Sequence, residues 1–295
     1  MTRDSRAGYT ASSPELEQWL ARHIAQGFDA ESLVLSMLRS GYDATFARET
    51  VNAAMGRPQP AVRAQVSAPA TRAATSKPDA ALRGNAFRHE DREMPVLFRL
   101  ESPRILLIQN LLDHAECDAL VTLARDRLQR SPVVNPDTGD ENLIDARTSM
   151  GAMFQVGEHA LLQLIEARIA AVTGLPVEHG EGLQILNYKP GGEYQPHFDF
   201  FNPKRPGEAR QLRVGGQRVA TMVIYLNSPA AGGATAFPRV GLEVAPVKGN
   251  AVLFSYRLPD GKLDERTLHA GLPVESGEKW IATKWLREHP YRSKG

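Results

Sequence analysis

The second half of the chain is a close succession of short apolar segments, and this spacing limits the folds that the chain can adopt. After residue 180 these segments alternate with connections that carry glycine or proline. Many short strands at such close spacing are typical of a β-sandwich or a β-barrel. The expected strands are 182–188, 193–200, 218–227, 241–247, 250–256, 266–272 and 279–287.

Two segments with helical periodicity precede these strands. Asp113 can cap a helix over 113–131, and Glu116 stands at the capping-box position. A second helix over 157–173 ends at a glycine, which is a common C-terminal signal. An apolar run at 103–112 is compatible with a further buried strand. This order predicts an α+β domain whose core is a double-stranded β-helix, the jelly-roll arrangement, with supporting helices.

Changes in composition divide the chain into three parts. Residues 1–56 contain short segments with apolar residues at helical spacing, which predicts a small all-α N-terminal unit. Residues 57–93 are rich in alanine and proline and lack apolar periodicity, so we expect a linker there. Residues 94–295 form the main domain. The apolar faces within 14–55 indicate a hydrophobic mini-core, and a module that binds a protein partner is the alternative.

The overall composition argues against several classes of protein. Hydrophobic residues make up 42% of the chain and charged residues 23%, and the net charge is +1, so nothing indicates a nucleic-acid or membrane partner. Cys117 is the single cysteine, which excludes an intramolecular disulfide and a cysteine-rich zinc site. The N-terminus has no apolar signal-peptide core, and no apolar stretch is long enough to span a bilayer. We therefore expect a soluble, cytoplasmic protein.

The stretch "EYQPHFDFF" (193–201) places a histidine and an aspartate two residues apart among aromatic residues. In a strand, His197 and Asp199 point to the same side and could converge on a metal ion. A buried hydrogen-bonded His/Asp pair is the alternative. His269, on another short expected strand, supplies a third ligand. Two histidines and one carboxylate form the facial triad of non-haem Fe(II) oxygenases, and a zinc hydrolase is the rival interpretation.

The last expected strand, "KWIATKWLR" (279–287), distinguishes between these interpretations. Alternation places Lys279 and Thr283 on the same face as Ile281 and Trp285. A lysine inside a barrel is unfavourable unless an anion meets it, although a lysine at an exposed strand edge is the alternative. A dicarboxylate 2-oxo acid fits this layout, because its 2-oxo acid end can chelate iron while its far carboxylate reaches Lys279.

With these residues in place, the chain from about 103 to 287 resembles the 2-oxoglutarate- and Fe(II)-dependent dioxygenases, specifically the bacterial-type prolyl 4-hydroxylase family. The order of the similar stretches and the interval of ten residues from His269 to Lys279 agree as well. The similar stretches are "PRILLIQNLLDHAECDALVTLA", "RTSMGAMF", "LQILNYKPGGEYQPHFDFF", "GGQRVATMVIYLN", "GGATAFP", "VKGNAVLFSY" and "LHAGLPVESGEKWIATKW".

The resemblance implies a role for each matching residue. Those expected to bind Fe(II) are His197, Asp199 and His269. The distal carboxylate of 2-oxoglutarate is expected to meet Lys279, helped by Thr283 and Tyr188. The place of the prolyl substrate is expected to be lined by Tyr194, Arg218 and Trp285. Ascorbate is expected as a reductant.

The activity implied is the O₂-dependent hydroxylation of peptidyl proline at C4, with release of succinate and CO₂ and with a peptide or protein as the substrate. Two positions depart from the family pattern: Ala234 stands in "GGAT" where the family often has "GGET", and Arg287 replaces a histidine near the substrate. The identity of the substrate therefore stays open. The alternatives are the same chemistry on a free amino acid or another side chain, or a non-catalytic binding module that uses the N-terminal helices.

Overall fold

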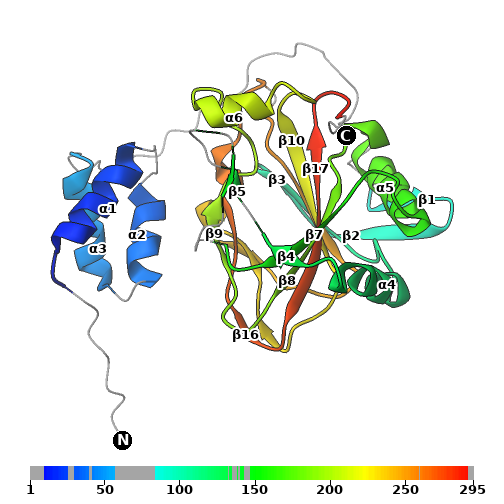
Figure 1. Cartoon of the computed structure of the whole chain (residues 1–295), viewed down its shortest axis with the longest axis horizontal. Coiled ribbons are helices and arrows are strands. Elements are labelled where there is room, and N and C mark those ends of the chain that lie inside the picture. Colours follow the sequence, from blue (N-terminus) through cyan, green and yellow to red (C-terminus); the bar gives the residue numbers. More distant parts are fainter. Residues whose placement is uncertain are drawn as a thin grey trace, which may run out of the picture. The chain divides into compact units, whose positions relative to one another are not determined.

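The structure is a computed structural model, and its chain forms two compact units, Met1–Ala73 and Ala74–Gly295 (Figure 1). Within them it describes residues 10–25, 30–39, 42–56, 84–131, 133–134, 138, 140–142, 147–258 and 260–291. Across these residues, no helix is both long and apolar enough to cross a membrane.

The described residues of the first unit form three short helices, α1 (Pro14–Ala25), α2 (Ala30–Arg39) and α3 (Ala44–Ala54). Asp43 begins α3, because its carboxylate accepts hydrogen bonds from the backbone N–H groups of the first turn. The helices are held together by a small apolar core, since each contributes side chains that are almost fully buried. These are Leu16, Leu20, Leu33, Met37, Ala47 and Val51.

The second unit combines three α-helices with seventeen short strands among its described residues. The helices are α4 (His114–Arg125), α5 (Ala160–Thr173) and α6 (Pro206–Gln211), and the 3-10 helices are η2 (Val177–His179), η3 (Pro238–Val240) and η4 (Glu265–Thr267). The strands are β1 (Ala86–His89), β2 (Arg92–Glu101), β3 (Arg104–Ile108), β4 (Gln129–Arg130), β5 (Val133–Val134), β6 (Glu141–Asn142), β7 (Met150–Phe154), β8 (Leu183–Tyr188), β9 (Tyr194–His197), β10 (Arg218–Tyr225), β11 (Ala231–Gly232), β12 (Thr235–Phe237), β13 (Leu242–Val244), β14 (Ala251–Ser255), β15 (His269–Gly271), β16 (Val274–Ser276) and β17 (Lys279–Arg287).

Two antiparallel sheets make up most of this unit. The larger has nine strands in the order β1-β2-β3-β14-β10-β17-β8-β7-β4, and the smaller has four in the order β13-β12-β15-β9. One apolar core combines residues of β8, β10, β14 and β17 with residues of β12 and β13, so it lies between the two sheets. The predicted mixed helix and strand class is confirmed, and the facing sheets support the expected jelly roll.

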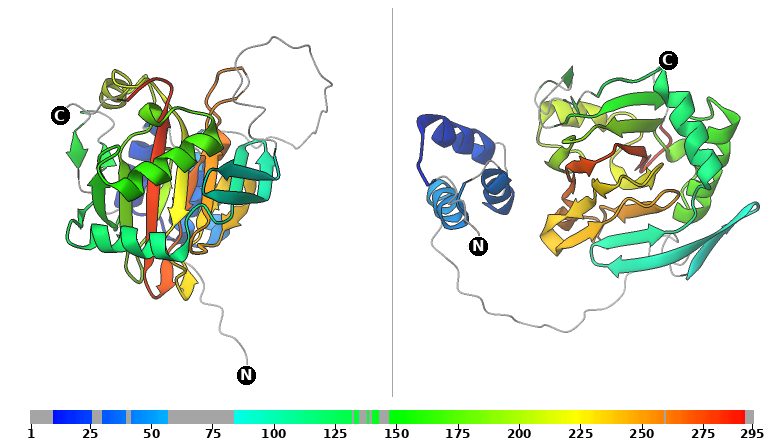
Figure 2. Two further views of the ribbon diagram at one scale, coloured as in Figure 1. Left: turned by 90° about the vertical axis from the view of Figure 1, so that its right-hand side faces the viewer. Right: turned by 90° about the horizontal axis from the view of Figure 1, so that it is seen from below.

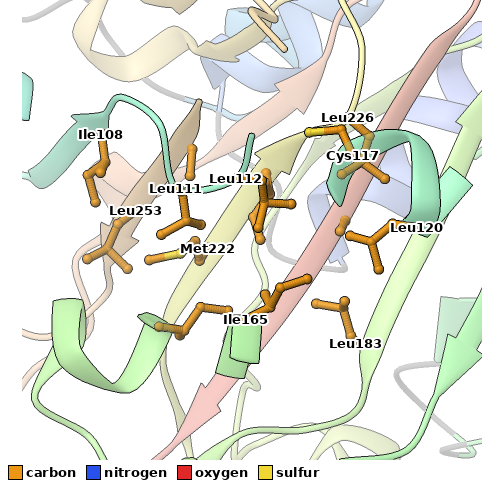
Figure 3. Packing of buried hydrophobic residues seen from close by; sticks show 14 of the residues in the cluster. Ile108, Leu111, Leu112, Cys117, Leu120, Ile165, Leu183, Met222, Leu226 and Leu253 are labelled. Carbon is orange, nitrogen blue, oxygen red and sulfur yellow. The ribbon is translucent and has the colours of Figure 1, made fainter. Parts of the chain in front are cut away.

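A second core lies on the other side of the large sheet. Helices α4 and α5 lie across that face, as the left view of Figure 2 shows. Their apolar residues pack against the outward side chains of the strands, and Figure 3 shows Leu120 and Ile165 of the helices near Leu183 and Met222 of the sheet. Each central strand is therefore buried on both faces, which explains its nearly continuous apolar sequence.

Strand β17 follows the alternation expected from its sequence. Ile281 belongs to the core between the sheets, whereas Trp280 and Ala282 belong to the core under the helices. The register places Lys279 opposite Tyr188 of β8. Lys279 therefore points toward the interior of the sheet pair, because it shares the face of Ile281.

Several elements begin or end elsewhere than the sequence predicts. Strand β9 ends at His197, so Asp199 lies beyond it, and the carbonyl of Asp199 accepts a hydrogen bond from Arg218 instead of a neighbouring strand. Strand β15 is shorter than 266–272, because Asp264 caps the 3-10 turn η4 before it. Residues 86–93, assigned to the linker from the sequence, form β1 and the start of β2, where Phe87 and Met94 are buried.

A buried arginine connects the first hairpin of this unit to both long helices. The side chain of Arg168 in α5 has no solvent exposure and forms ion pairs with Asp91 and with Glu116 of α4, the latter at 2.7 Å. It also donates to the carbonyl of Leu111 at 3.1 Å. Two carboxylates and one buried carbonyl therefore depend on one guanidinium.

We expect Arg168→Leu to lower the free energy of unfolding by about 3–5 kcal/mol, because it removes two ion pairs of a fully buried guanidinium and leaves the carbonyl of Leu111 without this donor. At about 2–4 °C per kcal/mol for a domain of this size, calorimetry should register a melting temperature lowered by roughly 10 °C. Arg88→Leu is the control, because Arg88 and Glu93 pair with side chains that are 78% and 55% exposed. Equal melting temperatures for the two variants would contradict the structural role of Arg168.

Candidate metal centre

The structure brings His197, Asp199 and His269 to one place. His197 and His269 are direct partners in the antiparallel pair β9–β15, although 72 residues separate them in the sequence. His197 Nε2 lies 3.5 Å from Asp199 Oδ1, and His269 Nε2 lies 3.4 Å from Asp199 Oδ2. One ligand atom from each residue lies within 4.8 Å of the other two, which is close enough to share one metal ion.

The hydrogen bonds of the two imidazoles set which ring nitrogen is free. His197 Nδ1 lies 2.8 Å from the carbonyl of Gln195, and His269 Nδ1 lies 3.0 Å from the carbonyl of Thr267. A carbonyl only accepts, so in each ring Nδ1 carries the proton and the lone pair of a neutral ring is at Nε2. When the rings are neutral, the lone pairs of both Nε2 atoms face the carboxylate oxygens of Asp199 with no proton between them, an arrangement that a cation stabilises.

Charge and burial at this cluster favour the forms that ligate a metal. Burial alone would raise the pKa of Asp199, but the nearby charge of His269 and the hydrogen bonds with the histidines hold it well below its ordinary value. Burial and the neighbouring His269 lower the pKa of His197 and so favour its neutral form. Two imidazoles and one ionised carboxylate fit Fe(II), as they would Zn(II).

Lys279 lies inside the same sheet pair and is buried. Burial lowers the pKa of its amine to about 8. Its Nζ lies 5.6 Å from the centre of the Tyr188 ring, and in the described part of the chain it has neither a hydrogen bond nor an ion pair. An ammonium buried without an anion is unfavourable, so this position suits an anionic ligand.

Tyr188 lies beside Lys279, whereas Thr283 lies four residues further along β17. Thr283 is buried on the same face of β17, two residues beyond Ile281. Tyr188 presents its ring to Lys279, whereas its hydroxyl contacts the side chains of Ser149 and Arg147. Burial raises the pKa of this phenol, so it stays protonated at neutral pH. The hydroxyl of Tyr188 is therefore engaged away from Lys279, and Thr283 adds a buried hydroxyl on the same face of β17.

The three residues predicted to line the substrate position surround the metal cluster. The ring of Tyr194 stacks on that of His197 with centroids 3.6 Å apart. Arg218 donates to the backbone carbonyl of Asp199 at 3.2 Å, and its guanidinium lies 4.1 Å from the ring centre of Trp285. Tyr194 and Arg218 therefore each contact a candidate metal ligand, and Trp285 contacts Arg218.

The guanidinium of Arg287 is held by hydrogen bonds to three other residues. Its Nε donates to Glu181 at 2.6 Å, and its Nη1 donates to the carbonyls of Gln211 and Gly216 at 3.1 and 2.6 Å. Glu181 also pairs with Arg218. Arg287 therefore attaches the segment that contains α6 to the end of β17, and through Glu181 it supports Arg218.

Four residues at this site were missed from the sequence. The guanidinium of Arg147 lies 4.9 Å from the ring centre of Tyr194, and Glu181 pairs with Arg218, while Thr221 and Tyr256 reach Asp199 itself. Thr221 shares the inward face of β10 with Val223 and Tyr225, so alternation could have indicated its direction. Nothing local in the sequence indicates its partner, because Asp199 belongs to a different part of the fold.

Comparisons with known proteins agree with this geometry. The family model of the 2OG-Fe(II) oxygenase superfamily matches residues 183–287. Prolyl 4-hydroxylase 1 of Arabidopsis thaliana is 42% identical over 63% of this chain and 70% of its own length. Probable prolyl 4-hydroxylase 10 of the same plant is 39% identical over 64% of this chain and 71% of its own length.

A solved structure is also similar. The viral collagen prolyl hydroxylase of Paramecium Bursaria Chlorella virus-1, in a 2OG complex, is 31% identical and has a TM-score of 0.49, covering 62% of this chain and 95% of that one. The identities with the plant enzymes show that the chain belongs to the prolyl 4-hydroxylase family of the 2-oxoglutarate- and Fe(II)-dependent oxygenases. The predicted family is confirmed.

Proposed function

We propose that this protein hydroxylates peptidyl proline at C4 in a reaction that requires Fe(II), 2-oxoglutarate and O₂ and releases succinate and CO₂. The observation that carries the proposal is the pairing of the triad His197, Asp199 and His269 with the buried, unpaired amine of Lys279. A buried cation in the same sheet pair as the triad fits a dicarboxylate 2-oxo acid, which can chelate the metal at one end and meet Lys279 at the other. The names of the plant relatives support proline as the target.

Each ligand has a defined role in this proposal. Nε2 of His197, Nε2 of His269 and the carboxylate of Asp199 would hold Fe(II). With 2-oxoglutarate and O₂, the iron supplies the oxidising chemistry that inserts an oxygen atom into an aliphatic C–H bond. The carbonyls of Gln195 and Thr267 keep the proton on Nδ1 of each ring, so Nε2 is always the nitrogen presented to the metal.

The co-substrate would lie between the metal and Lys279. Lys279 would donate to its distal carboxylate, and the hydroxyl of Thr283 would donate beside it. The ring of Tyr188 would close one side of this space, since its hydroxyl is already engaged with Ser149 and Arg147. The ring of Tyr188 and the cation of Lys279 would help to orient the dicarboxylate, as the reaction requires.

The peptide would meet the residues around the metal. Tyr194 and Trp285 offer flat aromatic surfaces on which a pyrrolidine ring can pack. Arg218 has one donor on the carbonyl of Asp199 and two on Glu181, which hold its guanidinium against Trp285. Because Arg287 restrains both Glu181 and the α6 segment, it would keep this wall rigid without touching the peptide.

We expect Arg287→Met to raise the KM for a peptide substrate by about tenfold, while the KM for 2-oxoglutarate changes less than about twofold. The reason is that the backbone carbonyls of Gly216 and Gln211 lose the hydrogen bonds from Arg287, whereas the residues around Lys279 are unchanged. Arg127→Met is the matched control, because Arg127 pairs with Glu158 on the helical side of the unit. A rise in both KM values, or in neither, would contradict this role of Arg287.

Mass spectrometry of a panel of proline-containing peptides tests the proposed reaction. The full chain is incubated with Fe(II), 2-oxoglutarate and ascorbate, and both succinate and the gain of one oxygen atom are measured. Hydroxyproline formed in step with succinate is the expected result. Oxygen on another side chain or on a free amino acid would overturn the prolyl assignment, and the absence of succinate under all conditions would overturn the enzymatic one.

A further inference from the structure

Two buried hydroxyl groups meet the carboxylate of Asp199. The hydroxyl of Thr221 donates to Asp199 Oδ2 at 2.7 Å. The hydroxyl of Tyr256 lies 3.2 Å from the same oxygen and also contacts the hydroxyl of Thr221. Both side chains have no solvent exposure. One oxygen of the carboxylate therefore receives both contacts.

These hydroxyls come from the opposite sheet. Thr221 lies on β10 and Tyr256 directly follows β14, neighbouring strands of the nine-stranded sheet. His197 and His269 lie on β9 and β15 of the four-stranded sheet. Asp199 lies past the end of β9 and has no place in a strand ladder. Its orientation therefore depends on side-chain contacts across the sheet pair rather than on backbone pairing.

The two oxygens of Asp199 are not equivalent. Each lies near an imidazole nitrogen, Oδ1 at 3.5 Å from His197 Nε2 and Oδ2 at 3.4 Å from His269 Nε2, so the distances to the histidines do not distinguish the two oxygens. The two hydroxyl groups distinguish them, because they occupy lone pairs of Oδ2 and leave those of Oδ1 free. A carboxylate restrained in this way presents one oxygen to a metal instead of two.

We propose that Thr221 and Tyr256 are positioning residues that restrict Asp199 to ligation through a single oxygen and so keep a coordination position open for the co-substrate. This inference rests on the proposed function of the triad and deepens it. Without the hydroxyls, Oδ2 would turn toward the metal, and the second carboxylate oxygen would compete with incoming ligands for that position.

Cobalt(II) binding to the full chain tests the proposal without turnover. The variants are Tyr256→Phe, Thr221→Val and the double variant, and the readouts are the dissociation constant from calorimetric titration and the visible absorption spectrum of the bound ion. Because loss of a supporting hydrogen bond weakens a ligand whereas a second ligating oxygen strengthens binding, we expect the dissociation constant of each variant to change by less than about tenfold. We also expect the absorption bands to shift, because their position and intensity report the coordination geometry.

Three controls separate positioning from a general loss of structure. Tyr225→Phe removes a buried hydroxyl of the same core that donates to Thr235 instead of Asp199, and it should bind cobalt as the unaltered chain does. Thr221→Ser retains the hydroxyl and should restore both the affinity and the spectrum. His269→Ala should abolish binding.

The outcomes distinguish this inference from the assignment on which it rests. If His269→Ala binds cobalt normally, the proposed metal centre is wrong. If His269→Ala loses cobalt while Tyr256→Phe and Thr221→Val keep the affinity and spectrum of the unaltered chain, the centre stands and the positioning role is overturned. Equal spectral changes in Thr221→Ser and Thr221→Val would also overturn it, because the hydroxyl would then be irrelevant.

Discussion

Replacement of Asp199 by alanine is expected to abolish Fe(II)-dependent succinate formation, and replacement of His197 or His269 should do the same. Residues that only support a ligand typically change metal affinity by about 10–100-fold, so loss of a ligand itself should lower turnover by more than about 100-fold. The unit should remain folded, because both apolar cores consist of other residues. Succinate production and circular dichroism together check both expectations.

A surface carboxylate provides the control for this prediction. Asp118 pairs with Lys248, and its side chain is 70% exposed, so Asp118→Ala removes the same group without touching the sheet pair. It should retain full turnover. Addition of a chelator should inactivate the unaltered chain, and added Fe(II) should restore it. Full turnover by Asp199→Ala would exclude Asp199 from the triad, whereas a remaining turnover of a few per cent would not.

Replacement of Lys279 by alanine is expected to raise the KM for 2-oxoglutarate by about 10–100-fold, since a hydrogen bond to a charged group contributes about 1.5–3 kcal/mol. Lys279→Arg should be partly active at best, because the arginine fork is longer and planar. Lys189→Ala is the control, because Lys189 is an exposed lysine that pairs with Glu278. An unchanged KM in Lys279→Ala would place the anchor elsewhere.

The pKa of Lys279 gives this site a pH dependence of defined sign. The amine must be protonated to attract a carboxylate, and burial lowers its pKa from 10.5 to about 8 in the free protein. The KM for 2-oxoglutarate should therefore be flat below about pH 8 and rise above it. Lys279→Arg should not show this rise, because arginine stays protonated throughout. A rise of the same size in Lys279→Arg would assign the titration to another group.

The sequence by itself determined features that repeat locally along the chain. Side chains in a strand alternate with a period of two, so the inward directions of Lys279 and Thr283 could be predicted without knowing which strand lay opposite. The same holds for the start of α4, where Asp113 and Glu116 form the predicted capping box. His197 and Asp199 could be selected because they are close in sequence, and His269 because it lies on another short expected strand that could pair beside the first.

The tertiary structure alone decided which distant groups meet. The sequence placed Asp199 within a strand, but Asp199 lies beyond the strand end. There Arg218 donates a hydrogen bond to its backbone carbonyl, and Thr221 donates one to its carboxylate. Arg287 stands where the family has a histidine near the substrate, and in the structure it donates to the carbonyls of Gln211 and Gly216. The physical reason is that strand direction follows from the local backbone, whereas the choice of partner follows from pairings between strands that are far apart in the sequence and from the packing of one sheet on the other.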